Sequence, residues 1–279
     1  MFITVLSVFS CTKVVPYPDT NEDKMLKINA FVGNRDSSFF YLDRVYPLTG
    51  GSMIHPDKID SLYADIHLTV NGNPIETEKM FDMDTLRATY YTLYRFSPGD
   101  KVGFNAYVRG FPEISSETVI PDSPENDVES IKVIIEGNGN RTLEVIIDDP
   151  ENSKDYYAVY MEARTDRKYE ADPMQVALTV RFDGSLDSSL NYDSMWILVD
   201  DVLADASSRM RFTANLTGVL EARVKVRRIS KGYYFGMINS IGKSFGFSNT
   251  GSISYSNIKG GMGCLGAYNE YVSEWIQLQ

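Results

Sequence analysis

Regular alternation of apolar and polar residues is the feature that most constrains the fold of this chain. Every second residue is apolar over 64–70, and the same alternation runs over 220–227. Side chains of a β-strand point to opposite faces in turn, so each segment predicts a strand with one buried and one solvated face. Such strands are typical of antiparallel sheets. A helical period is rare in this sequence.

Ten further segments are rich in β-branched and aromatic residues and also predict strands. The 18 tyrosines and 14 phenylalanines of the chain favour strands over helices. Gly, Asn, Asp and Pro separate the segments, and residues 137–141 predict a hairpin turn. One short helix is predicted over 232–241, with Ser230 as its cap. The ten strands are predicted over 27–32, 38–46, 89–96, 101–109, 131–136, 143–147, 156–164, 174–182, 195–199 and 209–213.

The clearest domain boundary lies at residues 121–127, a polar segment with two prolines that follows a completed run of strands. We therefore expect an all-β protein with two β-sandwich domains of the immunoglobulin- or fibronectin-like kind. The first domain is expected over 26–121 and the second over 128–279, with a linker over 122–127. The short helix and a glycine-rich segment belong to the second domain.

The first eleven residues resemble a lipoprotein export signal. Residues 1–10 carry no charge and are too few to span a bilayer, and they end in a small residue before Cys11. This order resembles the bacterial lipobox, in which the cysteine becomes the lipidated first residue of the mature protein. We expect a signal peptide remnant over 1–10, lipid attachment at Cys11 and a tether over 11–25. Because no basic residue precedes Cys11, the alternative is an apolar terminus packed on the folded body.

Cys264 is the second of the two cysteines of the chain. If Cys11 is acylated, Cys264 has no partner for an intramolecular disulfide. A lone cysteine is more often a small buried residue than a nucleophile, so we expect Cys264 to be buried and inert.

The charge of the chain limits its partners. The formal net charge is -11, and the sequence pI is about 4.7. Binding of nucleic acid needs clustered Lys and Arg, so nucleic acid is not an expected partner. Electrostatic docking on an anionic membrane is disfavoured for the same reason, which leaves the N-terminal lipid as the expected membrane contact.

Few residues of familiar catalytic or metal sites occur. Residues 261–266 match the G-x-G-x-x-G pattern of dinucleotide binding, but no helix is expected after them. Their glycines are interpreted instead as positions of close backbone approach, where the last strand rejoins the sheet. His67 and Asp65 share the polar face of one strand, and two ligands make no metal site. Asp82 and Asp84 lack the EF-hand spacing of a Ca²⁺ loop. We expect no catalytic residue, metal or cofactor.

Tyrosines form the strongest candidate recognition surface. Neighbours such as Tyr156 and Tyr157 place one ring on each face of a strand, and outward rings suit binding of a sugar, a peptide or a protein. Strand propensity alone also explains these residues, so both interpretations stay open. The tyrosines concerned are Tyr90, Tyr91, Tyr94, Tyr156, Tyr157, Tyr160, Tyr233 and Tyr234.

A glycine-rich segment near the C-terminus resembles the signature of a known family. Residues 256–267 read SNIKGGMGCLGA. They are similar to the near-terminal signature of a Bacteroidota outer-membrane lipoprotein family of unknown function (domain of unknown function four-two-four-nine). Met262 and Leu265 replace the Leu and Phe that are more usual there. The matching residues are Ser256, Asn257, Ile258, Gly260, Gly261, Gly263, Gly266 and Ala267.

Other segments also resemble this family, which extends the resemblance over nearly the whole mature chain. They are the valines that follow Cys11, the Asp-Pro element before Tyr156, and the tyrosine pair before the glycine-rich segment. The resemblance implies an outer-membrane lipoprotein, commonly encoded beside TonB-dependent receptors, with an N-terminal sandwich and a second β domain. It implies no catalytic residue.

The expected function is that of a non-enzymatic outer-membrane lipoprotein that serves as accessory or binding partner of a TonB-dependent nutrient receptor. The alternative is a structural or adhesive envelope lipoprotein without a small-molecule ligand. A cleft lined by outward tyrosines and polar groups would favour capture of a sugar or peptide, and a flat apolar patch would favour a protein partner. A pocket that holds His55 or His67 beside carboxylates would favour an enzyme. Residues 12–18 lack the early acidic residues that the resemblance associates with surface exposure, so the face of the outer membrane stays open.

Overall fold

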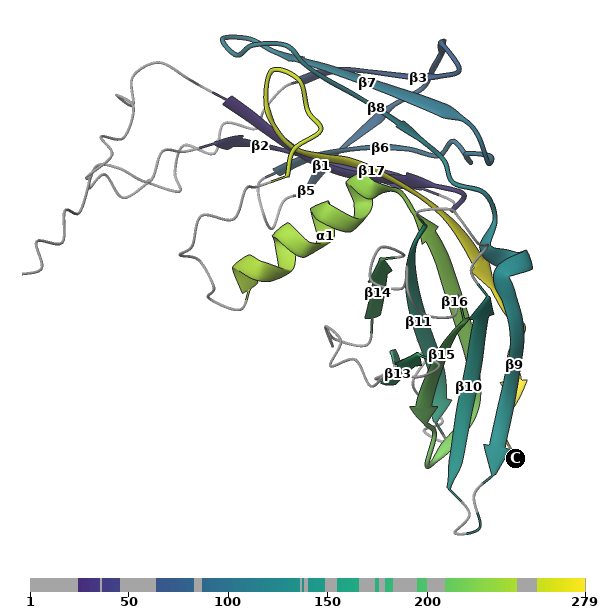
Figure 1. Ribbon diagram of the computed structural model, residues 1–279. Helices are drawn as coiled ribbons and strands as arrows, with labels where there is room; N and C mark the ends of the chain where they lie inside the picture. The colour runs from purple at the N-terminus through teal and green to yellow at the C-terminus, as the bar shows by residue number, and fades with distance from the viewer. Residues whose placement is uncertain are drawn as a thin grey trace, which may run out of the picture.

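The described part of the chain folds into β-strands and one α-helix, α1 (Lys231–Ser244), which confirms the all-β class (Figure 1). Cys11, the expected signal remnant, His55, Asp84 and nearly all of the expected tether lie outside the described residues. No described helix is long and apolar enough to cross a membrane. The computed structural model describes residues 25–35, 37–45, 64–82, 87–135, 137, 140–148, 155–165, 174–175, 179–182, 195–199, 209–244 and 255–278.

A long sheet of ten strands runs through the molecule. Eight of them follow one another in the order β12 (Met174–Gln175), β11 (Tyr156–Thr165), β16 (Val219–Ile229), β17 (Met262–Val272), β1 (Met25–Gly33), β2 (Ser38–Val45), β6 (Arg87–Thr92) and β5 (Glu78–Asp82). Two short strands join this path, β14 (Met195–Val199) beside β11 and β18 (Ile276–Gln277) beside β16. The C-terminal β17 pairs in parallel with β1 and antiparallel with β16, so it connects the two ends of the chain.

Two smaller sheets of four strands each pack on this long sheet. One has the order β4 (Asn73–Ile75), β3 (Ala64–Val70), β7 (Lys101–Val108) and β8 (Ile114–Val119). The other has the order β13 (Thr179–Phe182), β15 (Arg209–Asn215), β10 (Arg141–Asp148) and β9 (Val128–Ile135). The 3₁₀ turn η2 (Pro124–Asp127) lies between them in the chain.

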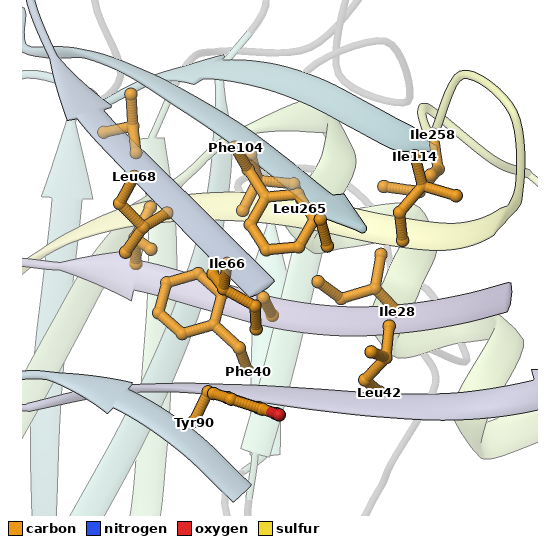
Figure 2. Packing of buried hydrophobic residues seen from close by; sticks show 14 of the residues in the cluster. Ile28, Phe40, Leu42, Ile66, Leu68, Tyr90, Phe104, Ile114, Ile258 and Leu265 are labelled. Carbon is orange, nitrogen blue, oxygen red and sulfur yellow. The ribbon is translucent and has the colours of Figure 1, made fainter. Parts of the chain in front are cut away.

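Each small sheet encloses a hydrophobic core against the long sheet. In the first core the rings of Phe40 and Phe104 stack with their centroids 5.7 Å apart, and Ile66, Leu68 and Leu265 pack around them (Figure 2). The second core is built around the fully buried Tyr157 and Phe212. Burial of these large apolar side chains is the main source of stability for both ends of the molecule.

Both cores lie on one face of the long sheet, and α1 lies on the other. Leu265 of β17 belongs to the first core, and alternation along the strand places Tyr271 on the same face. Tyr271 pairs with Val226 of β16, which belongs to the second core. On the opposite face, α1 packs on Cys264, where a Cβ added at Gly236 would lie 2.2 Å from the sulfur.

The long sheet is continuous across the predicted boundary at residues 121–127. Strands from before this segment (β1, β2, β5 and β6) and strands from after it (β11, β16 and β17) pair in one ladder. Ile258 and Leu265 from the C-terminal part lie in the same core as Leu26. The boundary separates most residues of the first core from those of the second, while β17 contributes to the sheet behind both.

The sequence patterns missed β4, β5, β8 and β18 and misjudged one long strand. All described side chains of β5 are exposed, so its sequence carries no alternation. The single strand predicted over 174–182 is two short strands in different sheets, β12 in the long sheet and β13 in a small one. The predicted hairpin is confirmed, because β9 and β10 pair antiparallel on either side of it. The predicted helix is confirmed over slightly wider bounds.

Candidate functional site

The signature residues of the glycine-rich segment hold the backbone of several elements together. The Asn257 side chain donates to the carbonyl of Leu265 over 2.8 Å and accepts from its N–H over 2.9 Å. The carbonyl of Asn257 accepts from the Ser116 hydroxyl of β8 over 2.8 Å. Ile258 is buried in the first core, and the Ser256 hydroxyl accepts from its N–H over 3.3 Å. These residues therefore fasten β17 to β8.

The glycines of this segment stand where another chain segment comes too close for a side chain. Gly263 has φ 105, and a Cβ there would lie 1.8 Å from the Ile28 carbonyl oxygen. Gly260 also has positive φ, and a Cβ at Gly261 would meet both Ile114 and Leu26. At Gly266 a Cβ would lie 2.5 Å from the Tyr233 Cα. The interpretation of these glycines as positions of close backbone approach is confirmed, and the segment has an architectural role.

An open hollow lies on the face of the long sheet that carries α1. Its volume is about 220 Å³. Its walls come from β1, β2, β16, β17 and the first turn of α1, so neighbouring strands and the helix start shape it together. Five of its seven described lining residues are aromatic. The lining residues are Phe31, Ser37, Phe39, Tyr41, Arg227, Tyr233 and Tyr268.

Arg227 is the cation of this hollow. Its Nε donates to Glu270 over 2.5 Å, and its Nη1 donates to the hydroxyls of Tyr233 and Tyr160 over 3.0 and 3.2 Å. The guanidinium also lies over the Tyr268 ring, 4.4 Å from the centroid. Its Nη2 has no hydrogen-bond partner among the described residues. The side chain is thus held in place by four neighbours and retains two N–H donors.

Glu270 balances Arg227 and a second guanidinium. Its side chain is only 1% exposed, and Arg35 Nε lies 3.1 Å from Oε1 without the alignment of a hydrogen bond. Two guanidinium groups therefore share one carboxylate, and the group keeps a net positive charge. Burial alone would lower the pKa of Arg227, but Tyr233, Tyr160 and Glu270 outweigh burial and raise that pKa. The positive charge is consequently stable at any physiological pH.

A similar arrangement stands further along β16. Glu162 of β11 accepts from Arg223 Nε over 2.7 Å and from the Lys225 ammonium. Arg223 and Arg164 both lie over the Trp275 ring, with their guanidinium carbons 4.6 and 4.1 Å from its centroid. Again two cations share one carboxylate, so this strip of the face is more basic than the net charge of the chain suggests.

The structure separates the predicted tyrosines into several roles. Tyr157 is buried in the second core, and its hydroxyl donates to Asp127 over 3.0 Å. Tyr156 packs on Tyr234 of α1, with the ring centroids 4.9 Å apart. Tyr90 is buried, Tyr91 bonds to Glu78, and Tyr94 packs on Phe96. Only Tyr233 of the predicted set lines the hollow, and Tyr160 contacts it through Arg227.

Sequence reasoning missed most of the hollow. Phe39 and Tyr41 carried a partial signal, because alternation within 38–46 places both on the same face of one strand. Arg227 stands at a polar position of an alternating strand, where solvation was the expected environment. Nothing local shows that β17 and β1 would bring Glu270 and Phe31 beside it.

The other candidate catalytic, metal-binding and nucleotide-binding residues do not come together in a site. His67 lies on the exposed face of β3 as predicted, with Nε2 3.4 Å from Asp65, and it lines no part of the hollow. Among the described residues, no three His, Cys, Asp or Glu side chains are arranged to hold a metal ion. The G-x-G-x-x-G residues begin directly before β17 and continue into this strand, not at the start of a helix. Cys264 is buried as expected.

The architecture defines an all-β protein in which a long sheet carries two small sheets on one face and a helix with an aromatic hollow on the other. The chain belongs to the family described as Domain of unknown function (DUF4249), whose family model matches residues 12–274. This match confirms the resemblance to this domain of unknown function. A search of curated proteins finds no match to the chain.

Proposed function

We propose that this protein is a lipid-anchored, non-enzymatic binding protein of the outer membrane that acts as accessory to a TonB-dependent nutrient receptor. The observation that carries the binding part is the aromatic hollow around Arg227. It combines flat apolar walls with a few convergent polar groups, which is the usual composition of a small-molecule site. The receptor and the membrane rest on the resemblance and on Cys11.

The rigid position of the hollow supports recognition without a large conformational change. The strands that supply its walls (β16, β17, β1 and β2) are all interior strands, hydrogen-bonded on both sides. The Ser230 hydroxyl accepts from the Tyr233 N–H over 3.2 Å and fixes the helix residue of the hollow. Side chains on such a scaffold are ordered before the ligand arrives, which lowers the entropy cost of binding.

The proposed anchor supplies the location. Residues 1–10 suit the apolar core of an export signal, and the family match begins directly after Cys11. A chain with net charge -11 has little electrostatic attraction to an anionic membrane, so lipid at Cys11 would carry the attachment. The proposed tether over 11–25 would then let the folded body move near its receptor.

The two ends of the molecule are proposed to be sandwich domains of the immunoglobulin- or fibronectin-like kind, with boundaries at 26–121 and 128–279. The two separate cores support this division. The shared β17 means that the domains would be joined by a continuous sheet and not only by the linker over 122–127.

The anchor is tested by substitution of the two cysteines. Cys11→Ala is expected to move the protein from the membrane fraction to the soluble fraction. Cys264→Ala is the matched control, because Cys264 is buried and should leave the distribution unchanged. Continued membrane association of the Cys11→Ala protein would rule out lipid attachment at this residue.

The receptor is tested by purification of the lipidated protein from its native envelope under mild detergent. Recovery of a TonB-dependent receptor in stoichiometric amount is expected. Recovery of the protein without any receptor would defeat the accessory function.

A second candidate function, a structural or adhesive protein that binds another protein, is favoured by β5, which is the edge strand of the long sheet among the described residues. Met80 and Phe81 are exposed there on opposite faces, and an edge strand offers unpaired backbone groups for strand addition. Met80→Lys with Phe81→Lys should abolish capture of a protein partner if this edge is the contact. Unchanged capture would leave the hollow as the better supported site.

A further inference from the structure

The volume of the hollow limits what part of a ligand enters it. Pockets that enclose a drug-sized molecule measure roughly 300–1,000 Å³. The hollow, at about 220 Å³, is smaller than these and open on one side. It therefore accommodates one ring-sized group, while the rest of a larger ligand stays outside.

The walls suit a ring with one apolar face and hydroxyl groups at its rim. Phe39 and Tyr41 stack with an interplanar angle of 23°, and Phe31 lies 4.5 Å from Tyr233 between ring centroids. Flat aromatic faces pack against the C–H face of a sugar, while tyrosine hydroxyls bond to its hydroxyl groups. Tyr41 is 55% exposed, so its ring is available to such a ligand.

The position of the hollow on interior strands of the long sheet disfavours a peptide as its ligand. Peptides that bind to sheets usually add a strand at an edge, where main-chain groups are unpaired. The strands around the hollow are interior strands whose main-chain groups already form ladders with neighbours on both sides. Recognition at the hollow therefore depends on side chains, and the side chains present are aromatic rings, one serine hydroxyl and one guanidinium.

The charge of the hollow selects for an anion. Arg227 and Arg35 share Glu270, so one positive charge is left over. The Nη2 of Arg227 donates to none of the described residues, and the Arg227 side chain is 22% exposed. A guanidinium that bonds to an anionic oxygen forms hydrogen bonds about twice as strong as neutral ones.

We propose that the hollow binds an acidic sugar, a ring that carries a carboxylate or a sulfate. The ring packs on Phe39 and Tyr41, and its anionic group bonds to Arg227. This assignment deepens the proposed function and rests on it for the claim that the protein captures a ligand.

The test uses the full chain, purified from membranes in detergent, on an array of oligosaccharides. The array carries hexuronic acids, sialic acids and sulfated sugars beside the same compounds neutralised by methyl esterification or desulfation. Acidic forms are expected to bind about tenfold more tightly than their neutral forms, which is the affinity ratio of one good charged hydrogen bond. The carboxylated and sulfated arms distinguish the two anions.

Three variants test the location of binding. Tyr41→Ala is expected to weaken binding of the acidic sugar about tenfold, because it removes one wall of the hollow. Tyr107→Ala is the matched control, since Tyr107 is also a strand tyrosine, 53% exposed, but on β7 of a small sheet. Arg227→Lys keeps the charge beside Glu270 and loses the N–H donors of Nη2, so the preference for acidic over neutral sugars should decrease while the stacking contribution remains.

Several results would overturn the assignment. These are equal affinity for acidic and neutral forms, no binding of any acidic sugar, or full affinity after Tyr41→Ala. Binding of peptides that is lost after Tyr41→Ala would also overturn it. Receptor recovery measured on the same preparation separates this assignment from the proposed function. A receptor without sugar binding contradicts only the assignment, and sugar binding without a receptor contradicts only the accessory role.

Discussion

The hydroxyl of Ser230 accepts a hydrogen bond from the backbone N–H of Ala267 over 2.8 Å, and the N–H of Ser230 donates to the Ala267 carbonyl over 2.8 Å. Ser230 stands directly between β16 and α1, while Ala267 lies in the middle of β17. The same hydroxyl caps the helix by accepting from the Tyr233 N–H. One residue therefore fixes the start of α1, and with it one wall of the hollow, to the long sheet.

Replacement of the partly buried Ser230 should lower the free energy of unfolding more than is usual for a serine near the surface. Ser230→Ala removes a helix cap, worth about 1 kcal/mol, and leaves the Ala267 N–H without its partner, which costs roughly 1–3 kcal/mol more. We expect a loss of about 2–4 kcal/mol in the free energy of unfolding, measured by urea denaturation. Ser123→Ala is the control, because Ser123 makes a single exposed cap hydrogen bond to the Glu125 N–H of the short turn η2 and should cost less than about 1 kcal/mol. Equal losses in both variants would contradict the double role of Ser230.

Gly263 tests the close pairing of β17 with β1. In Gly263→Ala the new Cβ would lie 1.8 Å from the Ile28 carbonyl oxygen, so the two strands must separate. We expect a loss of more than about 3 kcal/mol, since backbone strain and a lost ladder contact add up. Gly218→Ala is matched in φ (77 against 105) but has nothing within 4 Å, so it should cost about 1–2 kcal/mol of strain alone. Similar unfolding midpoints for both variants would argue against the tight approach.

The contacts of Glu162 with Lys225 and Arg223 predict that the stability of the protein depends on pH. Burial alone would raise the pKa of Glu162, but hydrogen bonds from Lys225 and Arg223 outweigh it, and the pKa lies below its ordinary value of 4.5. A pKa lowered by folding stabilises the protein above the unfolded pKa, and this stability is lost as the pH falls through the folded pKa. Wild type should therefore exceed Glu162→Gln by about 1–2 kcal/mol at pH 7, and the difference should shrink below pH 4.5.

The control for this pH series is Glu117→Gln, which changes an exposed carboxylate of β8. Its unfolding free energy should stay within about 0.5 kcal/mol of the wild type across the same pH range. A difference between wild type and Glu162→Gln that stays constant from pH 7 to pH 3 would show that the ion pairs contribute no stability.

Cys264 should be chemically inert while the protein is folded. Burial raises the pKa of its thiol to about 11, so only about one molecule in a thousand carries the reactive thiolate at pH 8. In the Cys11→Ala protein, where Cys264 is the only cysteine, a thiol reagent should react with it very slowly until urea unfolds the chain. One equivalent should then react at once. Rapid labelling of the folded protein would mean that α1 opens readily from the sheet.

Local sequence patterns were sufficient to predict most of the individual strands. The alternation over 64–70 predicted β3 with its observed bounds, since the pleat of a strand involves only neighbouring residues. The pattern of Tyr234 and Met237 predicted α1, and Ser230 was correctly identified as its cap. β5 gave no such signal, because its described side chains are exposed on both faces and alternation requires one face to be buried.

The candidate site illustrates what local patterns lack. Arg227 and Glu270 pair across β16 and β17, and Phe31 joins them through the parallel pairing of β1 with β17. These contacts join residues from both ends of the chain. A strand carries its own alternation, but it does not specify which distant strand buries its apolar face.

The sequence by itself determined the all-β class, the bounds of many strands, the helix α1 with its cap, and the glycines at positions of close backbone approach. Each of these depends on the conformation and exposure of neighbouring residues. Only the tertiary structure decided that β17 stands between β1 and β16, and that Arg227 lies in an aromatic hollow instead of in solvent. The order of the strands in the sheet follows from the joint burial of apolar faces that lie far apart in the chain. A shift of a single strand in the sheet would remove the hollow.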